Sequence, residues 1–220
     1  MNADLFRQMA QSIIDGEDEQ AQRLAHQAIA QDIDPLEAIN QGFVIGIDQV
    51  GERFSCGDAF LPELVMAGEA MKAAIAVLEP EMDKQGTVRQ VLGKVILGTV
   101  AGDIHDIGKT LVGTLLSANG FEVIDLGVDV PVEKFADQAR ALGADIVGVS
   151  ALLTTTMTRQ RDVVEALDDL GLRPEVKVMV GGAPVTQSWV DEIHADGFSE
   201  DAVGAVSVAR QLMANKPIQA

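Results

Sequence analysis

The spacing of apolar residues divides the chain into two parts. Up to residue 79, apolar side chains recur at intervals of three and four, which is the period of amphipathic helices. From residue 93 onward, short continuous apolar runs alternate with helical patterns. The segment 80–92 between them is polar, begins with Pro80 and contains one glycine, so it marks a boundary. We therefore expect one domain over residues 1–88 and a second over residues 89–220.

The first part predicts four helices with short connections, an arrangement that packs as a small bundle. Two short helices are expected over residues 5–14 and 21–29. Asp34 and Pro35 are typical of the cap and the first turn of a third helix. The third and fourth helices each carry one apolar face, formed by Ile39, Phe43, Ile47, Val50 and Phe54, and by Leu61, Leu64, Val65, Gly68, Met71, Ile75 and Leu78.

The turn between the third and fourth helices is flanked by Phe54 and Leu61. Side chains at such a turn tend to be exposed, so these two form either a contact surface or part of the bundle core. Met66 and Met71 are expected to fill the core. Cys56 lies on the same turn and is expected to be unreactive, because Arg53 is its one basic neighbour.

The second part alternates strand and helix patterns five times. Strands are expected over residues 95–100, 121–126, 145–150 and 176–180, with a short fifth strand at 197–198. Strands joined through helices form a parallel sheet that has helices on both faces. The predicted fold is thus a four-helix bundle followed by a doubly wound, five-stranded α/β domain of the flavodoxin or Rossmann kind.

Several polar residues and glycines follow the strands of this predicted sheet. Asp103 and His105 come after the first strand, Ser150 and residues 154–156 (three threonines) after the third, and Gly181-Gly182 after the fourth. Because open parallel sheets bind ligands beyond the carboxyl ends of their strands, we expect these residues at one edge. A carboxylate two residues from a histidine can fix its tautomer and leave the other ring nitrogen for a metal.

These residues also allow other interpretations. Asp and His before a helix also serve as plain capping and surface residues. The chain has no GxGxxG or Walker sequence, which gives a nicotinamide or nucleoside triphosphate site little support. No second histidine or cysteine follows a pattern that would complete a zinc site. A lone histidine ligand suits a metal whose other ligands come from a macrocycle.

The composition limits the classes of partner. Apolar residues make up 47% of the 220, which is enough for a packed core. A formal net charge of −18 argues against nucleic acid or an anionic membrane, because both bind basic surfaces. The single cysteine excludes a disulfide framework and suits a reducing compartment. With no signal peptide and no apolar stretch that could span a bilayer, the sequence predicts a cytoplasmic protein.

Three motifs occur in order, each at a strand end. The segment 103–108, DIHDIG, matches the DxHxxG motif of cobalamin-binding domains, residues 150–152 match the SxL motif, and Gly181-Gly182 match the GG motif. The helical part is similar to the cap domain of methionine synthase and of corrinoid proteins. The chain therefore resembles, over nearly its whole length, the small corrinoid proteins that serve methylamine, methanol, betaine or aryl methyl ether demethylation.

The resemblance implies a role for each matched residue. His105 would bind cobalt in place of the cofactor's own benzimidazole, while Asp103 and Thr156 would hold His105 and relay a proton. Ser150 and Thr154 would hydrogen-bond the displaced benzimidazole tail. The other residues implied in cofactor binding are Gly102, Ile104, Asp106, Gly108 and Leu152 in and beside the motifs, Gly181, Gly182 and Ala202 along the slot for the tail, and Phe54, Leu61 and Leu64, which would cover the methyl face.

The sequence departs from the family at two positions. Thr156 replaces a serine, which keeps the hydroxyl and adds a methyl group. Phe198 lies where relatives often carry tyrosine, and it lacks the hydroxyl that could form a hydrogen bond there.

The function implied by the resemblance is that of a methyl carrier subunit rather than a complete enzyme. Its cobalt would accept a methyl group from a substrate-specific methyltransferase and pass it to a second methyltransferase, with coenzyme M or a tetrahydrofolate as acceptor. A reductive activator would be a further partner. His105 would leave and rebind cobalt in each cycle, and the cap would move about the segment 80–92.

Two other functions use the same kind of domain. A cobalamin-dependent sensor or regulator usually carries a basic DNA-binding unit, which the strong negative charge disfavours. The cobalamin subunit of a radical mutase shares the DxHxxG domain, but a helical cap with Phe54 and Leu61 argues against it.

Overall fold

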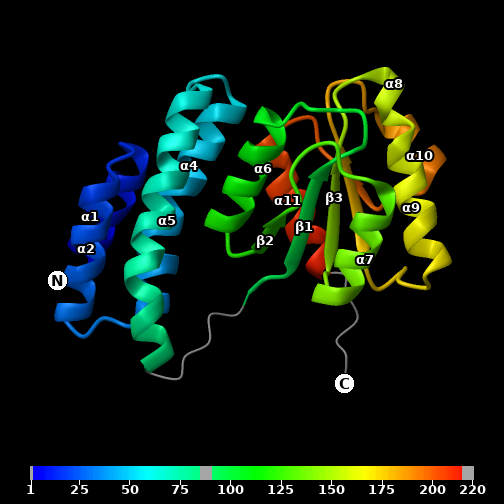
Figure 1. Ribbon diagram of the computed structural model, residues 1–220. Helices are drawn as coiled ribbons and strands as arrows, with labels where there is room; N and C mark the ends of the chain where they lie inside the picture. Colours follow the sequence, from blue (N-terminus) through cyan, green and yellow to red (C-terminus); the bar gives the residue numbers. More distant parts are fainter. Residues whose placement is uncertain (1, 85–90, 215–220) are drawn as a thin grey trace. The chain divides into compact units, whose positions relative to one another are not determined.

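The structure is a computed structural model that describes residues 2–84 and 91–214. The chain forms two compact units, Met1–Gln90 and Val91–Ala220 (Figure 1). The domain boundary predicted between residues 88 and 89 lies outside the described residues. Within the described ranges, every helix is too short or too polar to cross a bilayer.

The first unit is a bundle of helices. α1 (Asn2–Ile14), α2 (Asp18–Ala30) and α5 (Leu61–Lys84) correspond to three of the four predicted helices. The predicted third helix consists of α3 (Pro35–Ala38), a π-helical turn η1 (Ile39–Phe43) and α4 (Val44–Ser55). Asp34 caps α3 as predicted, because its carboxylate accepts a hydrogen bond from the Glu37 N–H at 3.0 Å.

Two glycines let α1 lie close against η1 and α4. A Cβ at Gly46 would lie 2.4 Å from the carbonyl oxygen of Ala10, and a Cβ at Gly42 would lie 2.7 Å from Sδ of Met9. Larger residues at either position would therefore push the helices apart. The apolar face predicted for the third helix is confirmed for four of its five members, which are all buried: Ile39, Phe43, Ile47 and Val50.

Helix α5 extends further than predicted. It passes through Pro80 and ends at Lys84, so residues 80–84 are helical and do not belong to a linker. Proline inside a helix costs one backbone hydrogen bond. Leu78 and Met82, on either side of Pro80, expose at most 2% of their surface. The burial of these two side chains keeps the chain helical here. The rest of the predicted hinge, residues 85–90, lies outside the described residues.

The start of α5 and the turn before it expose more apolar surface than predicted. Met71 is buried as predicted, but Met66 is 51% exposed and does not fill the core. Met66 instead lies over the turn between α1 and α2. A Cβ at Gly16, in this turn, would lie 2.6 Å from the Cβ of Met66. Phe60, which the sequence pattern did not single out, is 71% exposed.

The second unit contains the predicted parallel sheet. Its strands are β1 (Lys94–Thr99), β2 (Glu122–Asp125), β3 (Ile146–Ser150), β4 (Lys177–Gly181) and β5 (Gly197–Phe198). Their order is β2-β1-β3-β4-β5, and every neighbouring pair is parallel. This is the flavodoxin-like order. Successive strands are added toward one edge of the sheet up to β2 and toward the other edge from β3 onward, so the strand order reverses between β1 and β3. Register pairs Thr99 with Ser150 and Ser150 with Gly181.

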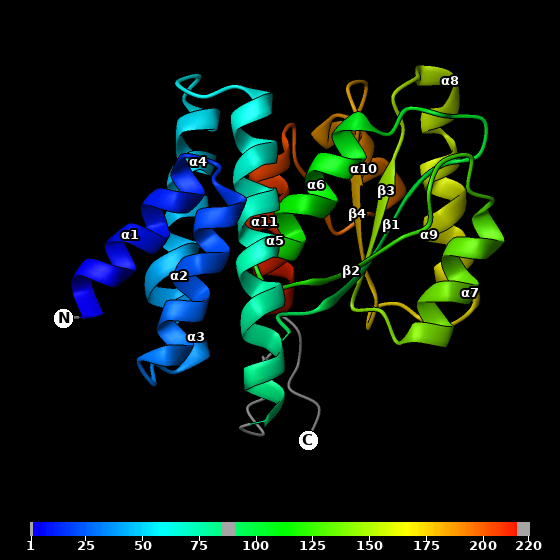
Figure 2. The ribbon, with the colours of Figure 1, turned by 60° about the vertical axis from the view of Figure 1, so that its left-hand side comes forward.

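Helices cover both faces of the sheet. α6 (Ile107–Ala118) and α11 (Ala202–Ala214) contact each other on one face, while α7 (Val132–Leu142) and α9 (Arg159–Asp169) contact each other on the opposite face (Figures 1 and 2). The short α8 (Thr154–Met157) follows β3 and α10 (Gln187–Ile193) follows β4. Two helical layers explain why β1 and β3 are apolar on both sides rather than in alternation.

The core beneath α7 and α9 is closely packed. Ile96, Val147 and Val178 from three adjacent strands are fully buried together with Phe135 of α7. A Cβ at Gly98 would lie 2.7 Å from the Phe135 ring, so the glycine in β1 makes room for that ring against the sheet.

Replacing Phe135 with alanine tests this core. The substitution leaves a cavity at a fully buried site, so we expect the free energy of unfolding to fall by about 3–5 kcal/mol. Urea unfolding followed by the fluorescence of Trp189, which belongs to the same core, gives the value. The control Phe60→Ala truncates an exposed ring and should change the free energy of unfolding by less than about 0.5 kcal/mol. Equal losses in both variants would contradict the expectation.

Candidate functional site

The loop after β1 is held in shape by hydrogen bonds to Asp129, which lies after β2. Gly102 adopts φ +82°, which favours glycine, and its N–H donates to the Asp129 carboxylate at 2.7 Å. The Asp129 N–H in turn donates to the carbonyl of Asp103 at 3.0 Å. These bonds turn the chain inward directly after the strand, and Asp103 is buried there with 1% of its surface exposed.

His105 is fixed by both its ring and its backbone. Its Nδ1 lies 2.7 Å from Oδ1 of Asp103, and its backbone N–H donates to the same oxygen at 3.1 Å. The hydroxyl of Thr99 donates to the His105 carbonyl at 2.9 Å. A carboxylate acceptor places the proton on Nδ1, which leaves the lone pair of Nε2 for another group. The imidazole is about half-exposed, with 47% of its side-chain surface accessible.

The second oxygen of Asp103 joins this loop to the one after β3. Oδ2 accepts hydrogen bonds from the Leu152 N–H at 2.8 Å and from the Thr156 hydroxyl at 2.7 Å. The predicted grouping of Asp103, His105 and Thr156 is therefore present in the structure. A weaker contact from the Leu153 N–H, at 3.4 Å, reaches the same oxygen.

These donors set the charge of Asp103. Burial raises the pKa of the carboxyl, but hydrogen bonds from Thr156, His105 and the backbone N–H groups of Leu152 and His105 outweigh burial. They hold the pKa of Asp103 well below its usual range. The group is therefore an anion at neutral pH, although it is almost inaccessible to water.

An ion pair between a buried lysine and a partly exposed carboxylate supports the loop and was not predicted. Lys109, in the first turn of α6, is 4% exposed and pairs with the carboxylate of Asp125 at the end of β2. Asp125 also accepts from the Gly127 N–H at 2.9 Å, and the Gly127 carbonyl accepts from the Thr99 N–H at 3.0 Å. The sequence carries one signal for this burial, because Lys109 lies seven residues before the buried Leu116 on the same helical face.

The ends of β3 and β4 form the other part of the site. Ser150 and Gly181 are paired in the register and are half-buried. Gly182 has φ +126°, and a Cβ there would lie 1.8 Å from the carbonyl oxygen of Ala151. No side chain fits at that point, so the second glycine of the GG pair is required by the close approach of two backbone segments.

The remaining predicted residues of this unit lie around the loops. Ile104 and Leu152 are 75% and 41% exposed, and Thr154 is exposed at the start of α8. Asp106 and Gly108, at the start of α6, are also exposed, whereas Ala202 is buried at the start of α11. Apolar side chains thus lie exposed on the same loops as the half-exposed imidazole.

Three predicted residues belong to the helical unit. Phe54 is half-buried near the end of α4, and Leu61 is 38% exposed at the start of α5. Leu64 was expected to cover the cofactor, but it is fully buried and its side chain presents no surface. Leu64 lies about one helical turn further into α5 than Leu61, where the helix is covered by the bundle.

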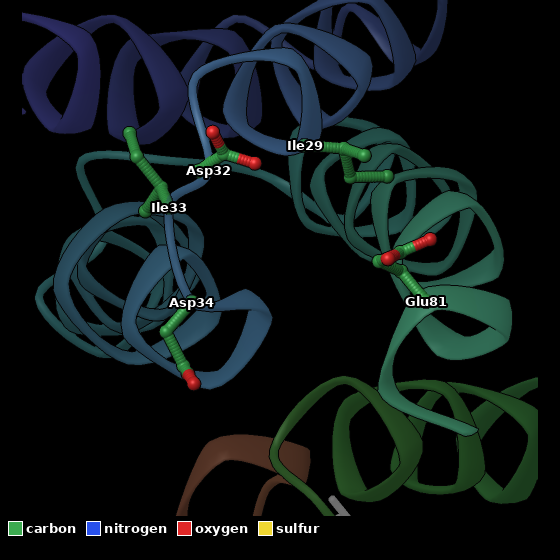
Figure 3. A pocket seen from close by; sticks show the side chains of 5 residues that line it. All are labelled: Ile29, Asp32, Ile33, Asp34 and Glu81. Carbon is green, nitrogen blue, oxygen red and sulfur yellow. The ribbon is translucent and has the colours of Figure 1, made fainter. Parts of the chain in front are cut away.

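The helical unit also contains a hollow that involves none of the predicted site residues. It is lined by Ile29 of α2, by residues 32–34 of the following turn and by Glu81 of α5 (Figure 3). Asp34 is already engaged as the cap of α3, and Glu81 pairs with Lys84 at 2.9 Å. The hollow therefore adds no chemistry to the site.

The donor set fits a metal that brings its own ring of ligands. Within residues 2–84 and 91–214, no three His, Cys, Asp or Glu side chains converge on a possible metal position. His105 offers a single nitrogen, and exposed apolar residues lie beside it in sequence. A cobalt corrinoid, which supplies four equatorial nitrogens and a large apolar ring, matches these residues better than a bare ion does.

Comparisons with known proteins agree with this fit. B12 binding domain models match residues 5–79 and 93–207. A corrinoid protein of Desulfitobacterium hafniense is 45% identical over 210 residues, 95% of this chain and 97% of the relative. A trimethylamine corrinoid protein of Methanosarcina acetivorans is 48% identical over 196 residues, 89% and 90% of the two chains. The methanol:cobalamin methyltransferase complex of Methanosarcina barkeri contains a chain that superposes with a TM-score of 0.85 at 30% identity, covering 97% of this chain and 81% of that one.

The hydroxyl of Thr156 can be tested through stability. Thr156→Val keeps the shape and removes the donor, which leaves a buried carboxylate short of one hydrogen bond. We expect the free energy of unfolding at neutral pH to fall by about 1–3 kcal/mol. Thr156→Ser keeps the hydroxyl, so its free energy of unfolding in the same urea titration should fall clearly less. A larger loss in the serine variant would show that the methyl group, not the hydrogen bond, stabilises the site.

The low pKa of Asp103 predicts a pH dependence of stability. Its ionised form is stabilised by folding, so its contribution is complete above the unfolded pKa, about 4, and is lost as pH falls toward the folded value. The difference in unfolding free energy between the wild type and Asp103→Asn should be largest near neutrality and shrink below about pH 4. Urea unfolding of both proteins from pH 7 downward measures it, and a difference independent of pH would contradict the assignment.

Proposed function

The chain belongs to the family of B12-binding proteins, and we propose that it is the corrinoid methyl carrier of a methyltransferase system. The observation that carries this proposal is the state of His105, whose Nδ1 is bound to a buried carboxylate while Nε2 is left for a metal. The motif that positions it lies at the carboxyl edge of the sheet, where such folds bind their ligands.

The residues that would hold the cofactor divide into two groups. His105 would bind cobalt through Nε2, held in orientation by Asp103. Ser150, Thr154 and the glycines at 181 and 182 would take the benzimidazole tail, with Ala202 beside the slot. A cobalt corrinoid held by these residues would supply the nucleophile for methyl transfer.

Asp103 and Thr156 would manage the proton of His105. Asp103 remains an anion because its pKa is held low, so the shared proton stays on Nδ1 of the imidazole. The Thr156 hydroxyl has two acceptors, the Asp103 carboxylate at 2.7 Å and the Leu153 carbonyl at 3.0 Å, so it can turn between them.

The helical unit would act as the lid over the methyl face. Phe54 and Leu61 would form this lid, together with the exposed Phe60, which adjoins Leu61. Leu64 is left out because it is buried. Apolar side chains over the reacting face would keep water away from it.

The partners would be two methyltransferases and a reductive activator. The relative of Methanosarcina acetivorans is named for trimethylamine, so a methylamine is the first donor to test. Coenzyme M and a tetrahydrofolate are the candidate acceptors. The mutase and sensor functions receive no support from relatives that match most of the chain and are named corrinoid proteins.

A spectroscopic comparison tests the ligand role of His105. Wild type, His105→Ala and His26→Ala are mixed with hydroxocobalamin and desalted, and their visible spectra are recorded. We expect wild type and His26→Ala, in which an exposed histidine of α2 is changed, to retain cobalamin with the same spectrum. His105→Ala should lose the cofactor or shift its absorption, because cobalt loses the imidazole.

Two outcomes would contradict the proposal. If the wild type retains no cobalamin, binding itself is refuted. If His105→Ala gives the wild-type spectrum, the protein binds cobalamin but not through this imidazole. Methyl transfer from a methylamine with its methyltransferase, measured on the loaded wild type, then tests the carrier role.

A further inference from the structure

Gln160 is a buried polar side chain outside the loop of His105, and its amide makes three hydrogen bonds. It lies in the first turn of α9 with none of its surface exposed. Its amide nitrogen donates to the carbonyl oxygens of Val149 at 2.9 Å and Gly181 at 3.0 Å. Its amide oxygen accepts from the indole N–H of Trp189 at 3.0 Å. Both amide protons and the oxygen are therefore used.

The two carbonyl groups belong to neighbouring strands at their carboxyl ends. Val149 is the residue before Ser150 in β3, and Gly181 is the last residue of β4. The Gly181 carbonyl also accepts from the Ala151 N–H at 3.1 Å, beside the point where the Gly182 backbone meets Ala151. One side chain thus links the backbone of both segments that carry the SxL and GG motifs.

A buried amide is not needed to fill this space. The other buried positions of α9 are apolar, namely Val163, Val164 and Leu167. Burying an amide is costly unless its hydrogen bonds are made, and its gain is a fixed geometry rather than additional stability. The Trp189 ring that donates to Gln160 is itself held in place. Arg161 stacks on this ring, 4.9 Å from its centroid, and pairs with Glu192.

We propose that Gln160 is a positioning residue for the slot that takes the nucleotide tail of the cofactor. It sets the ends of β3 and β4 so that Ser150, Gly181 and Gly182 are spaced for the tail. Thr156, four residues earlier in the chain, orients the carboxylate that binds His105. The inference rests on the proposed function and extends it to a residue outside the three motifs.

Discrimination between two corrinoids tests this role. Cobalamin carries the nucleotide tail and cobinamide lacks it, while both can bind His105 through cobalt. In Gln160→Met, which keeps the length and removes the hydrogen bonds, we expect the affinity for cobalamin to fall roughly tenfold, the equivalent of about 1.4 kcal/mol. The affinity for cobinamide should stay within about twofold, because no tail enters the slot. Quenching of Trp189, the single tryptophan, reports binding of either corrinoid.

Two further variants make the result specific. Gln160→Glu keeps the oxygen that faces Trp189 but loses both N–H donors, so it should show the same selective loss even if the methionine variant folds poorly. Gln187→Met changes an exposed glutamine of α10 that bonds only Asp191 among the described contacts, at 2.8 Å, and should bind both corrinoids as the wild type does.

The outcomes separate this inference from the proposed function. Equal loss of cobalamin and cobinamide in the Gln160 variants, or no loss of either, would overturn the positioning role while leaving the carrier function in place. If the wild type binds neither corrinoid, the proposed function is refuted and the inference with it.

Discussion

The buried carboxylate of Asp103 is the group on which the site depends. It is an anion with almost no access to water, and it is tolerated because its two oxygens accept from the ring and backbone of His105, from the Leu152 N–H and from Thr156. Removing any donor leaves a charge partly unpaired. The same bonds that stabilise the anion therefore join two loops and orient one imidazole, so the stability and the chemistry of this region are set together.

The sheet supplies the rigid frame for that carboxylate. Because β1 lies between β2 and β3, the loops after β1 and β3 emerge side by side at one edge. The Lys109–Asp125 pair supports the first loop through Thr99, and Gln160 fixes the ends of β3 and β4. Buried polar groups thus surround the site on several sides, and each has its partners, which is the condition under which such groups specify one geometry.

How far the sequence predicts the structure differs between particular elements. The strands were found because a sheet covered on both faces needs continuous apolar runs, and the Asp103–His105 contact was found because two residues lie close in the chain. The sequence pattern wrongly predicts that Met66 fills the core and that the helix stops at Pro80. Met66 lies over a turn that only the packing of α1 and α2 creates, and the helix at Pro80 persists because Leu78 and Met82 are buried.

The sequence by itself determined the alternation of strands and helices and the residues of the three motifs, because hydrophobic period and residue spacing are local properties. The tertiary structure decided which distant groups meet. Gln160 has no motif, and its role follows from carbonyl groups 11 and 21 residues away. The need for glycine at 182 follows from the approach of Ala151. Such contacts depend on how strands are placed beside one another, which no single stretch of sequence records.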